Sequence, residues 1–539
     1  MPDGTDTTDT TTDDDVRYVL AVDLGTGGPK VALVSTRGEV VAHTYRTNDL
    51  ILLPPEGVEQ DPEQWWSTIR DGARELLGAG HVQRDHVVAI SITAQWMGTV
   101  PVDEHGQHLA NALIWMDSRG APHVRRQVKG PLSFQGYDVR KLRSCVQITG
   151  GIPSRAGKDP VGHWLWFRHE APEVYRAAHK LLDVPDYLNL RLTGRAVTAH
   201  DVAVGCWASD NRDLSNVTWV PELIEWCGLD RAKLPDLVEP GSIVGPILPE
   251  VAADWGLGDH VQIVTGSGDT ASAPIGAGAV RPYEGHVYVG TSSWLSCHVE
   301  FKKTDIRSNI TSLPSGIAGR YWVATEQDTA GKCLTWLIEN LLYPDDGLGG
   351  PAPDDVFERI NAAAAAVPAG SNGVIFTPWL NGERTPVDDH RIRAGYHHLG
   401  LATTRADLVR ATLEGVALNT RWMLESVERF TKQRFEHLRF VGGGARSPLW
   451  CQIMADVLDR PILQVKDPVQ ANVRGAGLAA AVALGHLGWD DIPDLIEIEA
   501  THRPDPATRA VYDGHFDAFT TLYKRNKGVH HALTKAQHG

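Results

Sequence analysis

Short apolar runs that end in glycine or small polar residues recur along the chain and predict buried strands followed by turns. Residues 17–22 and 30–35 are two such runs, and the glycine-rich segment between them predicts a β-hairpin. Residues 87–94 predict another buried strand. Residues 61–80 begin with Asp-Pro and then have helical periodicity, which predicts a helix with proline in its first turn. Two further helices are predicted at residues 162–180 and 183–193.

The second half of the chain repeats this order of elements. Residues 286–293 predict a strand followed by Gly-Thr-Ser, and residues 437–447 predict a strand followed by three glycines. A helix is predicted to begin near Pro448, and residues 472–488 predict a helix of small residues suited to close packing. The pattern indicates two α/β halves that face one cleft and are joined near residues 275–285.

Length and composition limit the class of protein. A chain of 539 residues is too long for one ordinary core and predicts two or more domains. No run of about 18 apolar residues occurs, so a membrane-spanning helix is not expected. Residues 1–15 lack an apolar segment and predict a disordered acidic tail, and its six aspartates contribute to a net charge of −16. The acidic excess argues against general nucleic-acid binding.

The six cysteines are far apart and form no Cys-x-x-Cys pair. This spacing disfavours a zinc site or a disulfide framework, and it favours a reducing compartment. We therefore expect a cytoplasmic protein.

A single carboxylate, Asp269, stands among small residues after an apolar run. One interpretation is that it caps a helix beginning near Ala271. The other is that it acts as a general base, taking the proton of a sugar hydroxyl as that oxygen attacks the γ-phosphate of ATP. The next apolar run ends in Gly290-Thr291-Ser292, which can wrap backbone N–H groups around a phosphate. A base beside a phosphate loop suggests phosphoryl transfer to a hydroxyl.

The turn of the first predicted hairpin also suits an anion. Its glycines allow the backbone to approach a phosphate closely, Thr26 offers a hydroxyl, and Lys30 adds a positive charge. Asp23, at the end of the strand, is well placed to hold a hydrated Mg²⁺ through its waters. The alternative is an ordinary tight hairpin. The turn lacks the Walker pattern GxxxxGK[ST].

Three other segments suit a nucleotide or a polyol. The glycines of residues 442–447 allow the backbone to lie flat against an adenine or ribose, although a flexible turn would have the same sequence. Residues 93–103 and 115–120 place polar groups beside tryptophan and methionine, which suits a polyol pocket. The alternative for the last segment is a structural ion pair between Asp117 and Arg119.

In order and spacing, these segments resemble the FGGY carbohydrate kinases, which belong to the sugar kinase, actin and Hsp70 superfamily. The resemblance extends from about residue 17 to about residue 488. It rests on seven motifs taken together: DLGTGGPK at 23–30, AQWMG at 94–98, WMDSR at 115–119, GSGDT at 266–270, VGTSS at 289–293, RADLVRATLEGVA at 405–417 and GGGARSPLW at 442–450.

The resemblance implies two ribonuclease-H-like domains of the actin-like ATPase type around an interdomain cleft that closes on ATP and sugar. The expected parts are an acidic tail at 1–15, an N-terminal domain at 16–278, a C-terminal domain at 279–525 and a C-terminal tail at 526–539. The expected partner is a small sugar or polyol, with no nucleic acid or membrane. The family makes a homodimer plausible, although no residue of this sequence argues for one.

The resemblance also implies roles for individual residues. Asp269 is similar to the catalytic base, and Asp23 is similar to the carboxylate linked to Mg²⁺. Gln95, Trp96 and Met97 match the sugar-contacting segment of the family. Asp269 is implied to contact the sugar as well. The implied nucleotide contacts are Thr26 and Lys30 in the first phosphate loop, Gly290 and Thr291 in the second, and Gly331, Gly443, Gly444 and Ala445.

Within the family the sequence is most similar to xylulose kinases, with some departures. Met97 replaces the usual histidine, which removes a polar contact worth about 1–3 kcal/mol of preference. Gly27, Gly28 and Pro29 stand where serine or threonine is frequent, and His163 takes the place of a family lysine. Xylulose is thus the leading substrate. The alternatives are a kinase of another ketose or polyol, and a sensor of the same fold with little catalysis.

Overall fold

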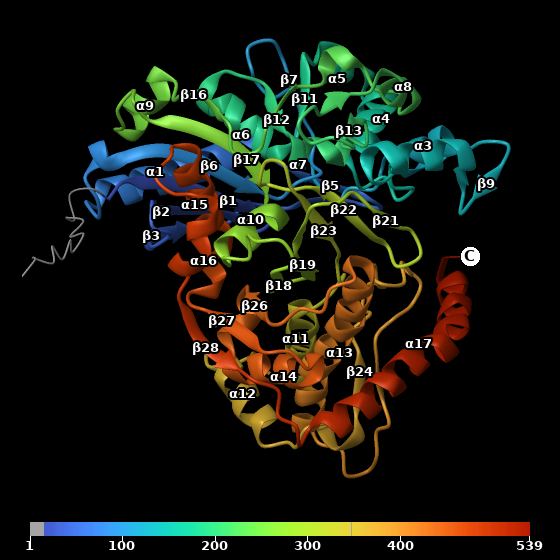
Figure 1. Cartoon of the computed structure of the whole chain (residues 1–539). Helices are drawn as coiled ribbons and strands as arrows, with labels where there is room; N and C mark the ends of the chain where they lie inside the picture. The colour runs from blue at the N-terminus through green and yellow to red at the C-terminus, as the bar shows by residue number, and fades with distance from the viewer. Residues whose placement is uncertain (1–15, 347, 539) are drawn as a thin grey trace, which may run out of the picture.

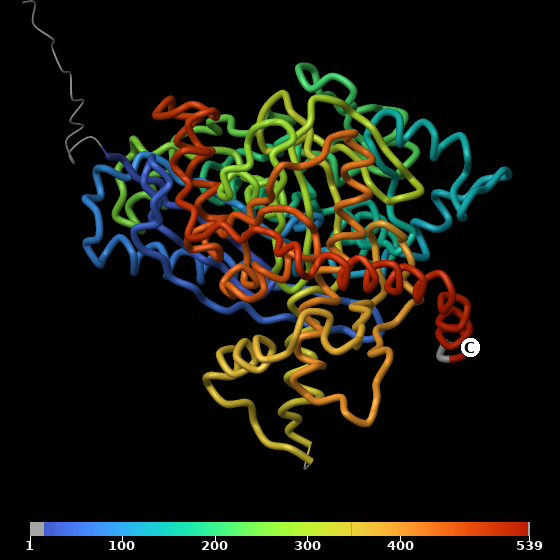
Figure 2. Tube along the Cα trace, turned by 60° about the horizontal axis from the view of Figure 1, so that its bottom comes forward, coloured from blue at the N-terminus to red at the C-terminus, as the bar shows by residue number. Residues whose placement is uncertain are grey.

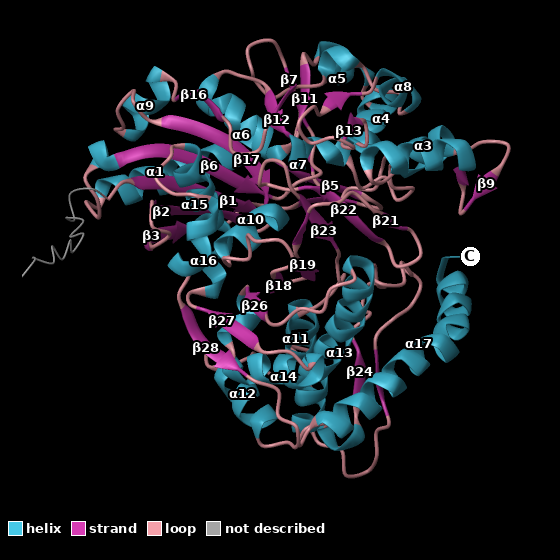
Figure 3. Ribbon diagram, viewed as in Figure 1, coloured by secondary structure: helices cyan, strands magenta, loops and turns pink. Residues whose placement is uncertain are grey.

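The computed structural model describes residues 16–346 and 348–538, and the predicted acidic tail at 1–15 lies outside the described residues. Two mixed α/β units lie one above the other (Figures 1 and 3). The upper unit contains most of the first half of the chain, and the lower unit contains most of the second half. Within the described residues, no helix is both long enough and apolar enough to cross a membrane.

The upper unit is built on a six-stranded sheet. In spatial order its strands are β16 (Ile243–Pro246), β17 (Gln262–Gly268), β6 (Val87–Ala94), β1 (Tyr18–Gly25), β2 (Gly28–Ser35) and β3 (Val40–Tyr45). Strands β17, β6 and β1 run parallel, so their carboxyl ends meet at one edge of the sheet. Strands β1 and β2 form the predicted hairpin, in which Gly25 pairs with Gly28 across a two-residue turn.

Helices α1 (Pro62–Gly78), α6 (Val184–Thr193) and α9 (Pro249–Trp255) contribute to the core of this unit. Helix α1 begins as predicted, with Asp61 accepting a hydrogen bond from the Glu63 N–H at 2.8 Å and proline in the first turn. The helix predicted over 162–180 is instead two helices, α4 (Pro160–Glu170) and α5 (Pro172–Ala177). Pro172 has no N–H to donate, so it ends one helix and begins the next.

The lower unit contains a five-stranded sheet, a four-stranded sheet and the longest helices. The five strands, in spatial order, are β19 (Ser293–Ser296), β18 (Gly285–Val289), β26 (Leu438–Val441), β27 (Ile462–Val465) and β28 (Ile498–His502). The four are β20 (His298–Val299), β23 (Tyr321–Ala324), β22 (Ile310–Pro314) and β21 (Thr304–Asp305). The helices of its core are α11 (Gly331–Leu337), α12 (Val356–Ala365), α13 (Arg405–Thr431), α14 (Pro448–Leu458) and α17 (Arg509–His538).

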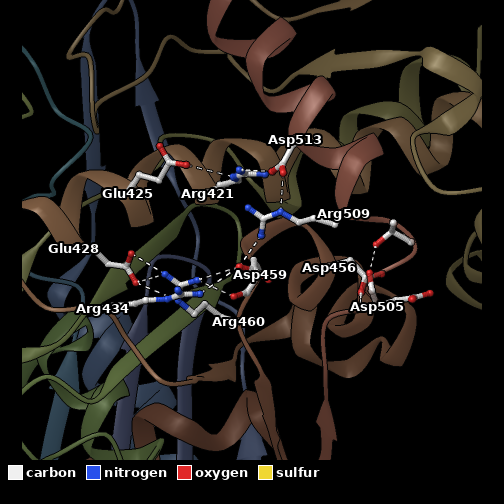
Figure 4. A network of polar contacts seen from close by, with 11 residues as sticks. Arg421, Glu425, Glu428, Arg434, Asp456, Asp459, Arg460, Asp505, Arg509 and Asp513 are labelled. Carbon is white, nitrogen blue, oxygen red and sulfur yellow. Dashed lines mark hydrogen bonds and ion pairs between the residues drawn. The ribbon is translucent and has the colours of Figure 1, made fainter.

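A network of ion pairs fastens the start of α17 to α13 and to the end of α14 (Figure 4). Arg509 pairs with Asp459 at 2.6 Å and with Asp513 at 2.7 Å, and Asp513 also pairs with Arg421 of α13 at 2.7 Å. Residues 526–538 continue this helix, which runs along the lower unit to the C-terminal end (Figure 2). The Thr534 hydroxyl there donates to the carbonyl oxygen of Arg391 at 2.8 Å.

Helix α15 (Ala471–Ala483) follows β27 of the lower unit but packs against the sheet of the upper unit. It crosses α10 (Asp269–Gly276) at two glycines. A Cβ at Gly475 would lie 2.1 Å from the carbonyl oxygen of Ser272, and one at Gly276 would lie 1.7 Å from that of Ala471. The predicted small-residue helix therefore exists, and its glycines are needed for this close contact. It ends at Ala483, short of the predicted residue 488.

Candidate functional site

Asp269 is the first residue of α10, immediately after β17 ends at Gly268. Its Oδ1 atom accepts a hydrogen bond from the Thr270 N–H at 2.8 Å, and part of the side chain remains exposed. Burial, assisted by the negative charges of Asp23 and Glu326, raises the pKa of Asp269 to about 7. A carboxylate of this kind can exchange a proton near neutral pH.

Asp23 lies near the end of β1, at the same edge of the sheet. Asp23 on β1 and Ser267 on β17 both pair with Thr93 of β6, so two strand spacings, about 10 Å, separate β1 from β17. Asp23 also faces Lys30 across the hairpin. Burial raises the pKa of Asp23, while the Lys30 charge and a hydrogen bond from Asn472 partly oppose this. The sheet thus brings the two predicted carboxylates to one place.

The first glycine loop is held by a closed ring of hydrogen bonds. The Thr26 hydroxyl donates to Gln95 Oε1 at 2.9 Å and accepts from Trp115 Nε1 at 3.0 Å. Gln95 Nε2 donates to Gln60 Oε1 at 2.7 Å, and Gln60 Nε2 donates to the Thr26 carbonyl oxygen at 2.8 Å. The Thr26 hydroxyl and the Gln95 amide, predicted to contact nucleotide and sugar, therefore both have protein partners. Gln60 was not singled out in the sequence.

Lys30 reaches the segment before α15. Its Nζ donates to the Val469 carbonyl oxygen at 2.5 Å, and burial lowers its pKa, partly offset by the Asp23 charge. The predicted cation thus lies beside Asp23, at a place where the upper unit contacts a segment of the second half of the chain.

The other three glycine segments meet at the end of β18. The Gly331 N–H donates to the Gly290 carbonyl oxygen at 2.9 Å, and a Cβ at Gly331 would lie 2.3 Å from that oxygen. The Thr291 carbonyl oxygen accepts the Ala330 N–H at 2.9 Å. A Cβ at Gly444 would lie 2.7 Å from Val289 Cγ1, so this glycine is also needed for close packing. The predicted nucleotide residues of the lower unit are thus neighbours.

Gly443 and Ala445 lie in the short 3₁₀ turn Gly443–Arg446 that follows β26. The Ala445 carbonyl oxygen accepts a hydrogen bond from Gln464 Nε2 at 2.8 Å. A hollow of about 490 Å³ lies beside this turn, and its lining includes Arg446, Gln464, Lys466 and His502. The turn therefore has open space on one side.

Strand β18 of the lower unit carries Tyr288, which lies close enough to Asp23 and Asp269 to interact with their charges. Burial raises the pKa of Tyr288, and the charges of Asp23 and Asp269 both add to this rise. Its ring stacks on Trp294 with 4.0 Å between the ring centroids. The candidate site therefore lies where the upper sheet meets the end of β18.

The segment predicted to contact sugar adjoins the turn that carries Asp269. A Cβ at Gly268 would lie 3.2 Å from Trp96 Cγ, so the indole packs against the residue before Asp269. Trp96 also joins an apolar cluster with Leu313 and Trp322 of the lower unit. Trp96 and Met97 are partly exposed, whereas Gln95 is buried. An apolar cluster with contributions from both units, of which Trp96 is partly exposed, thus lies beside the predicted base.

The sequence did not single out three charged residues that interact with one another, one of which also acts on Asp269. Glu326 follows β23 and forms an ion pair with Arg384, and its charge contributes to the raised pKa of Asp269. Burial lowers the pKa of Lys158, on the upper unit, and the Arg384 charge lowers it further. Arg384 lies 58 residues from Glu326, so no local pattern could have joined them.

Two other predicted features have structural partners. Arg119 pairs with Asp117 at 2.7 Å and with Glu59 at 2.6 Å, so the proposed ion pair of this segment exists. His163, in the place of a family lysine, is fully buried, with Nδ1 3.3 Å from the Thr99 hydroxyl. Burial lowers its pKa to about 4, so it carries no charge at neutral pH.

Comparisons with known proteins agree with this arrangement. A model of the N-terminal domain of the FGGY family of carbohydrate kinases matches residues 18–276, and a model of its C-terminal domain matches residues 285–484. The chain is 28% identical over 525 residues to the xylulose kinase of Bacillus subtilis (strain 168), covering 96% of this chain and 99% of that protein. It is 29% identical over 520 residues to the xylulose kinase of Escherichia coli (strain K12), covering 94% of this chain and 98% of that protein.

The crystal structure of xylulose kinase from Rhodospirillum rubrum is similar with a TM-score of 0.81 at 27% identity, covering 96% of this chain and 100% of that one. The predicted two-domain α/β fold and the predicted class of enzyme, a sugar kinase, are both confirmed by these matches. With one family model matching each half, the chain belongs to the FGGY family of carbohydrate kinases.

Proposed function

We propose that the protein transfers the γ-phosphate of ATP to a hydroxyl of a ketopentose, with xylulose as its preferred substrate and Asp269 as the general base. The observation that carries this proposal is the position of Asp269. Its carboxylate stands at the edge of the upper sheet, beside the apolar surface of Trp96 and near the end of β18, with a pKa raised to about 7.

In the proposed reaction, Asp269 accepts the proton of the sugar hydroxyl as the hydroxyl oxygen attacks the γ-phosphorus. A new oxygen–phosphorus bond forms, the bond between the γ-phosphorus and the bridging oxygen breaks, and ADP leaves with that electron pair. Lys30 lies beside Asp23 and supplies positive charge near the phosphates. The segments around Gly290, Gly331 and Gly444 are where backbone can approach the nucleotide closely.

The residues present fit a Mg²⁺ ion held largely by water and phosphate. Among residues 16–346 and 348–538, no group of three or more His, Cys, Asp or Glu side chains could hold a metal ion. Asp23 offers one partly exposed carboxylate, and Mg²⁺ commonly uses one or two carboxylates plus substrate phosphates. When bound, the ion would neutralise charge on the transferring phosphoryl group.

The proposal of xylulose as the substrate is supported by the relatives, which are xylulose kinases. The departure at Met97 makes the choice of sugar the part of the proposal to test first. Met97 is the chain's own substitution at a predicted sugar contact, and its neighbour Trp96 makes this surface apolar. A kinase of another ketose or polyol and a weakly catalytic sensor remain the alternatives. Cytoplasmic location and a homodimer stay predictions.

A panel of substrates tests the proposed function. Purified protein with Mg²⁺ and ATP is offered xylulose, other ketoses, polyols and glycerol, and ADP release is measured for each, with thermal shift recorded in parallel. We expect the highest kcat/KM with xylulose. A higher kcat/KM with another sugar would replace xylulose as the substrate. Thermal shifts with sugar and nucleotide but no ADP release would favour the sensor.

The pH dependence of turnover tests the role of Asp269. Its pKa is raised to about 7, so below pH 7 the group is mostly protonated and cannot accept the substrate proton. We therefore expect kcat/KM to rise about tenfold per pH unit below pH 7 and to level off above it. The profile is measured by ADP release between about pH 5.5 and 8.5. Activity that stays constant down to the lower limit would contradict this assignment.

A further inference from the structure

Asp183, the residue before α6, accepts hydrogen bonds from the backbone of the segment predicted to contact the sugar. Its Oδ2 atom accepts the Met97 N–H at 3.0 Å, and its Oδ1 atom accepts the Gly98 N–H at 3.1 Å. Oδ1 also accepts the Val184 N–H at 2.7 Å. The residue is only 8% exposed, so solvent cannot easily replace these contacts. One carboxylate from a distant part of the chain thus binds two consecutive amides of this segment.

The backbone of the segment needs such a partner. Met97 has φ of +60°, a left-handed conformation that costs a residue with a side chain about 1–2 kcal/mol. Consecutive N–H groups around a left-handed residue form a concave site that favours an anion. Gly98 packs closely against the start of α6, because a Cβ there would lie 2.7 Å from Val184 Cγ2. The segment and the start of α6 are therefore fitted to each other.

This conformation determines where the predicted sugar contacts lie. Trp96 packs against Gly268, next to Asp269, and a Cβ at Gly205 would lie 3.4 Å from Met97 Cγ. The other side of the turn has its own carboxylate, since the Ser267 hydroxyl donates to Asp201 Oδ2 at 2.6 Å. Loss of Asp183 would remove the hydrogen bonds that hold the Trp96–Met97 segment. The bond from Ser267 to Asp201, next to Asp269, would remain.

We propose that Asp183 is a positioning residue for the sugar, which fixes Trp96 and Met97 beside the Asp269 turn by binding the amides of Met97 and Gly98. This inference rests on the proposed function. It predicts a selective effect, because the glycine segments around Gly290 and Gly444 make none of these contacts.

Steady-state kinetics of Asp183→Ala and the isosteric Asp183→Asn test the proposal. We expect Asp183→Ala to raise the KM for the sugar by about tenfold or more, because it leaves the buried Met97 and Gly98 N–H groups without their acceptor. Asp183→Asn keeps one acceptor oxygen and should have a smaller effect. The KM for ATP should change less than about twofold, and kcat at saturating sugar should be largely retained.

Asp138 provides a matched control. It is also 8% exposed, and it accepts two backbone N–H groups, from Arg140 at 3.0 Å and Lys141 at 3.1 Å, at the start of another helix of the same unit. Asp138→Ala should lower the melting temperature and leave both KM values unchanged. An unchanged sugar KM in the Asp183 variants, or equal rises in both KM values, would overturn the proposal.

Hydrogen exchange separates this proposal from the proposed function. In Asp183→Ala and Asp183→Asn, the amides of Met97 and Gly98 should exchange faster than in the wild type, whatever the substrate is. If the wild type turns over no sugar, the proposed function fails and exchange still reports on Asp183. If Asp183→Ala does not fold, Asp183→Asn carries the test. Unchanged exchange in a folded variant would show that Asp183 does not hold this segment.

Discussion

Replacing Asp269 by asparagine is expected to lower kcat by a factor between about 10² and 10⁴, the usual contribution of a general base. Asparagine has the same shape and retains an oxygen for the Thr270 N–H, but it cannot take the proton of the sugar hydroxyl. The binding of ATP should change little. The measurements are ADP release at saturating sugar and calorimetric titration with ATP.

The same variant should be at least as stable as the wild type. Burial and the charges of Asp23 and Glu326 disfavour the ionised form of Asp269, so a neutral side chain removes an unfavourable interaction. A melting temperature equal to or above that of the wild type would exclude misfolding as the cause of lost turnover. Any residual activity should also lose the rise with pH near 7.

Asp61→Asn is a suitable control for this variant. Asp61 is also an aspartate at the start of a helix in the upper unit, and it accepts the Glu63 N–H at 2.8 Å. Its variant should retain normal turnover. If Asp269→Asn retained turnover within about tenfold of the wild type, the proton would have to go elsewhere, and Asp269 would not be the base.

Local sequence patterns were sufficient to predict most of the individual helices and strands that we named. The strand over Val87–Ala94 was predicted with its observed bounds, because a short, mostly apolar run rich in β-branched residues and flanked by polar His86 and Gln95 is a strong signal. Helix α14 was also predicted, since Ser447 caps it and Pro448 occupies its first turn. The helix expected over 162–180 was wrong as a single element, and the reason, Pro172, was visible in the sequence.

Contacts between distant segments could not be predicted in the same way. Gln60 joins Thr26 and Gln95 in one ring, but it lies 34 and 35 residues away from them. Asp183 binds Met97 across 86 residues. A single sequence shows which residues are neighbours along the chain, whereas these contacts depend on how α6 and the sheet are placed. Residues within motifs are recognisable from the sequence alone, whereas the partners that support them are set by the three-dimensional arrangement.

The ring of Gln60, Thr26 and Gln95 changes how two of the motif residues are understood. The resemblance implies that Thr26 contacts the nucleotide and that Gln95 contacts the sugar. The structure joins their side chains directly, at 2.9 Å. The loop predicted to bind phosphate and the segment predicted to contact the sugar are thus parts of one hydrogen-bonded unit.

Replacing Asp23 by asparagine is expected to lower kcat by about 10² to 10³ and to raise the Mg²⁺ concentration needed for half-maximal activity. The substituted amide would keep a polar group near Asn472 but would remove the negative charge that faces Lys30. Under the proposed function, this charge helps to hold the hydrated ion. Turnover is measured by ADP release in a Mg²⁺ titration at fixed ATP.

The dependence on Mg²⁺ distinguishes this role from that of Asp269. Asp269→Asn should need the same Mg²⁺ concentration as the wild type, because only its proton transfer is lost. As a further control, Asp103 accepts the His105 and Gln107 N–H groups, both at 2.9 Å, in a turn of the upper unit. Asp103→Asn should leave both kcat and the Mg²⁺ titration unchanged. If Asp23→Asn had a wild-type titration with reduced kcat, Asp23 would act through Lys30 and the loop geometry, and the metal-linked role would be wrong.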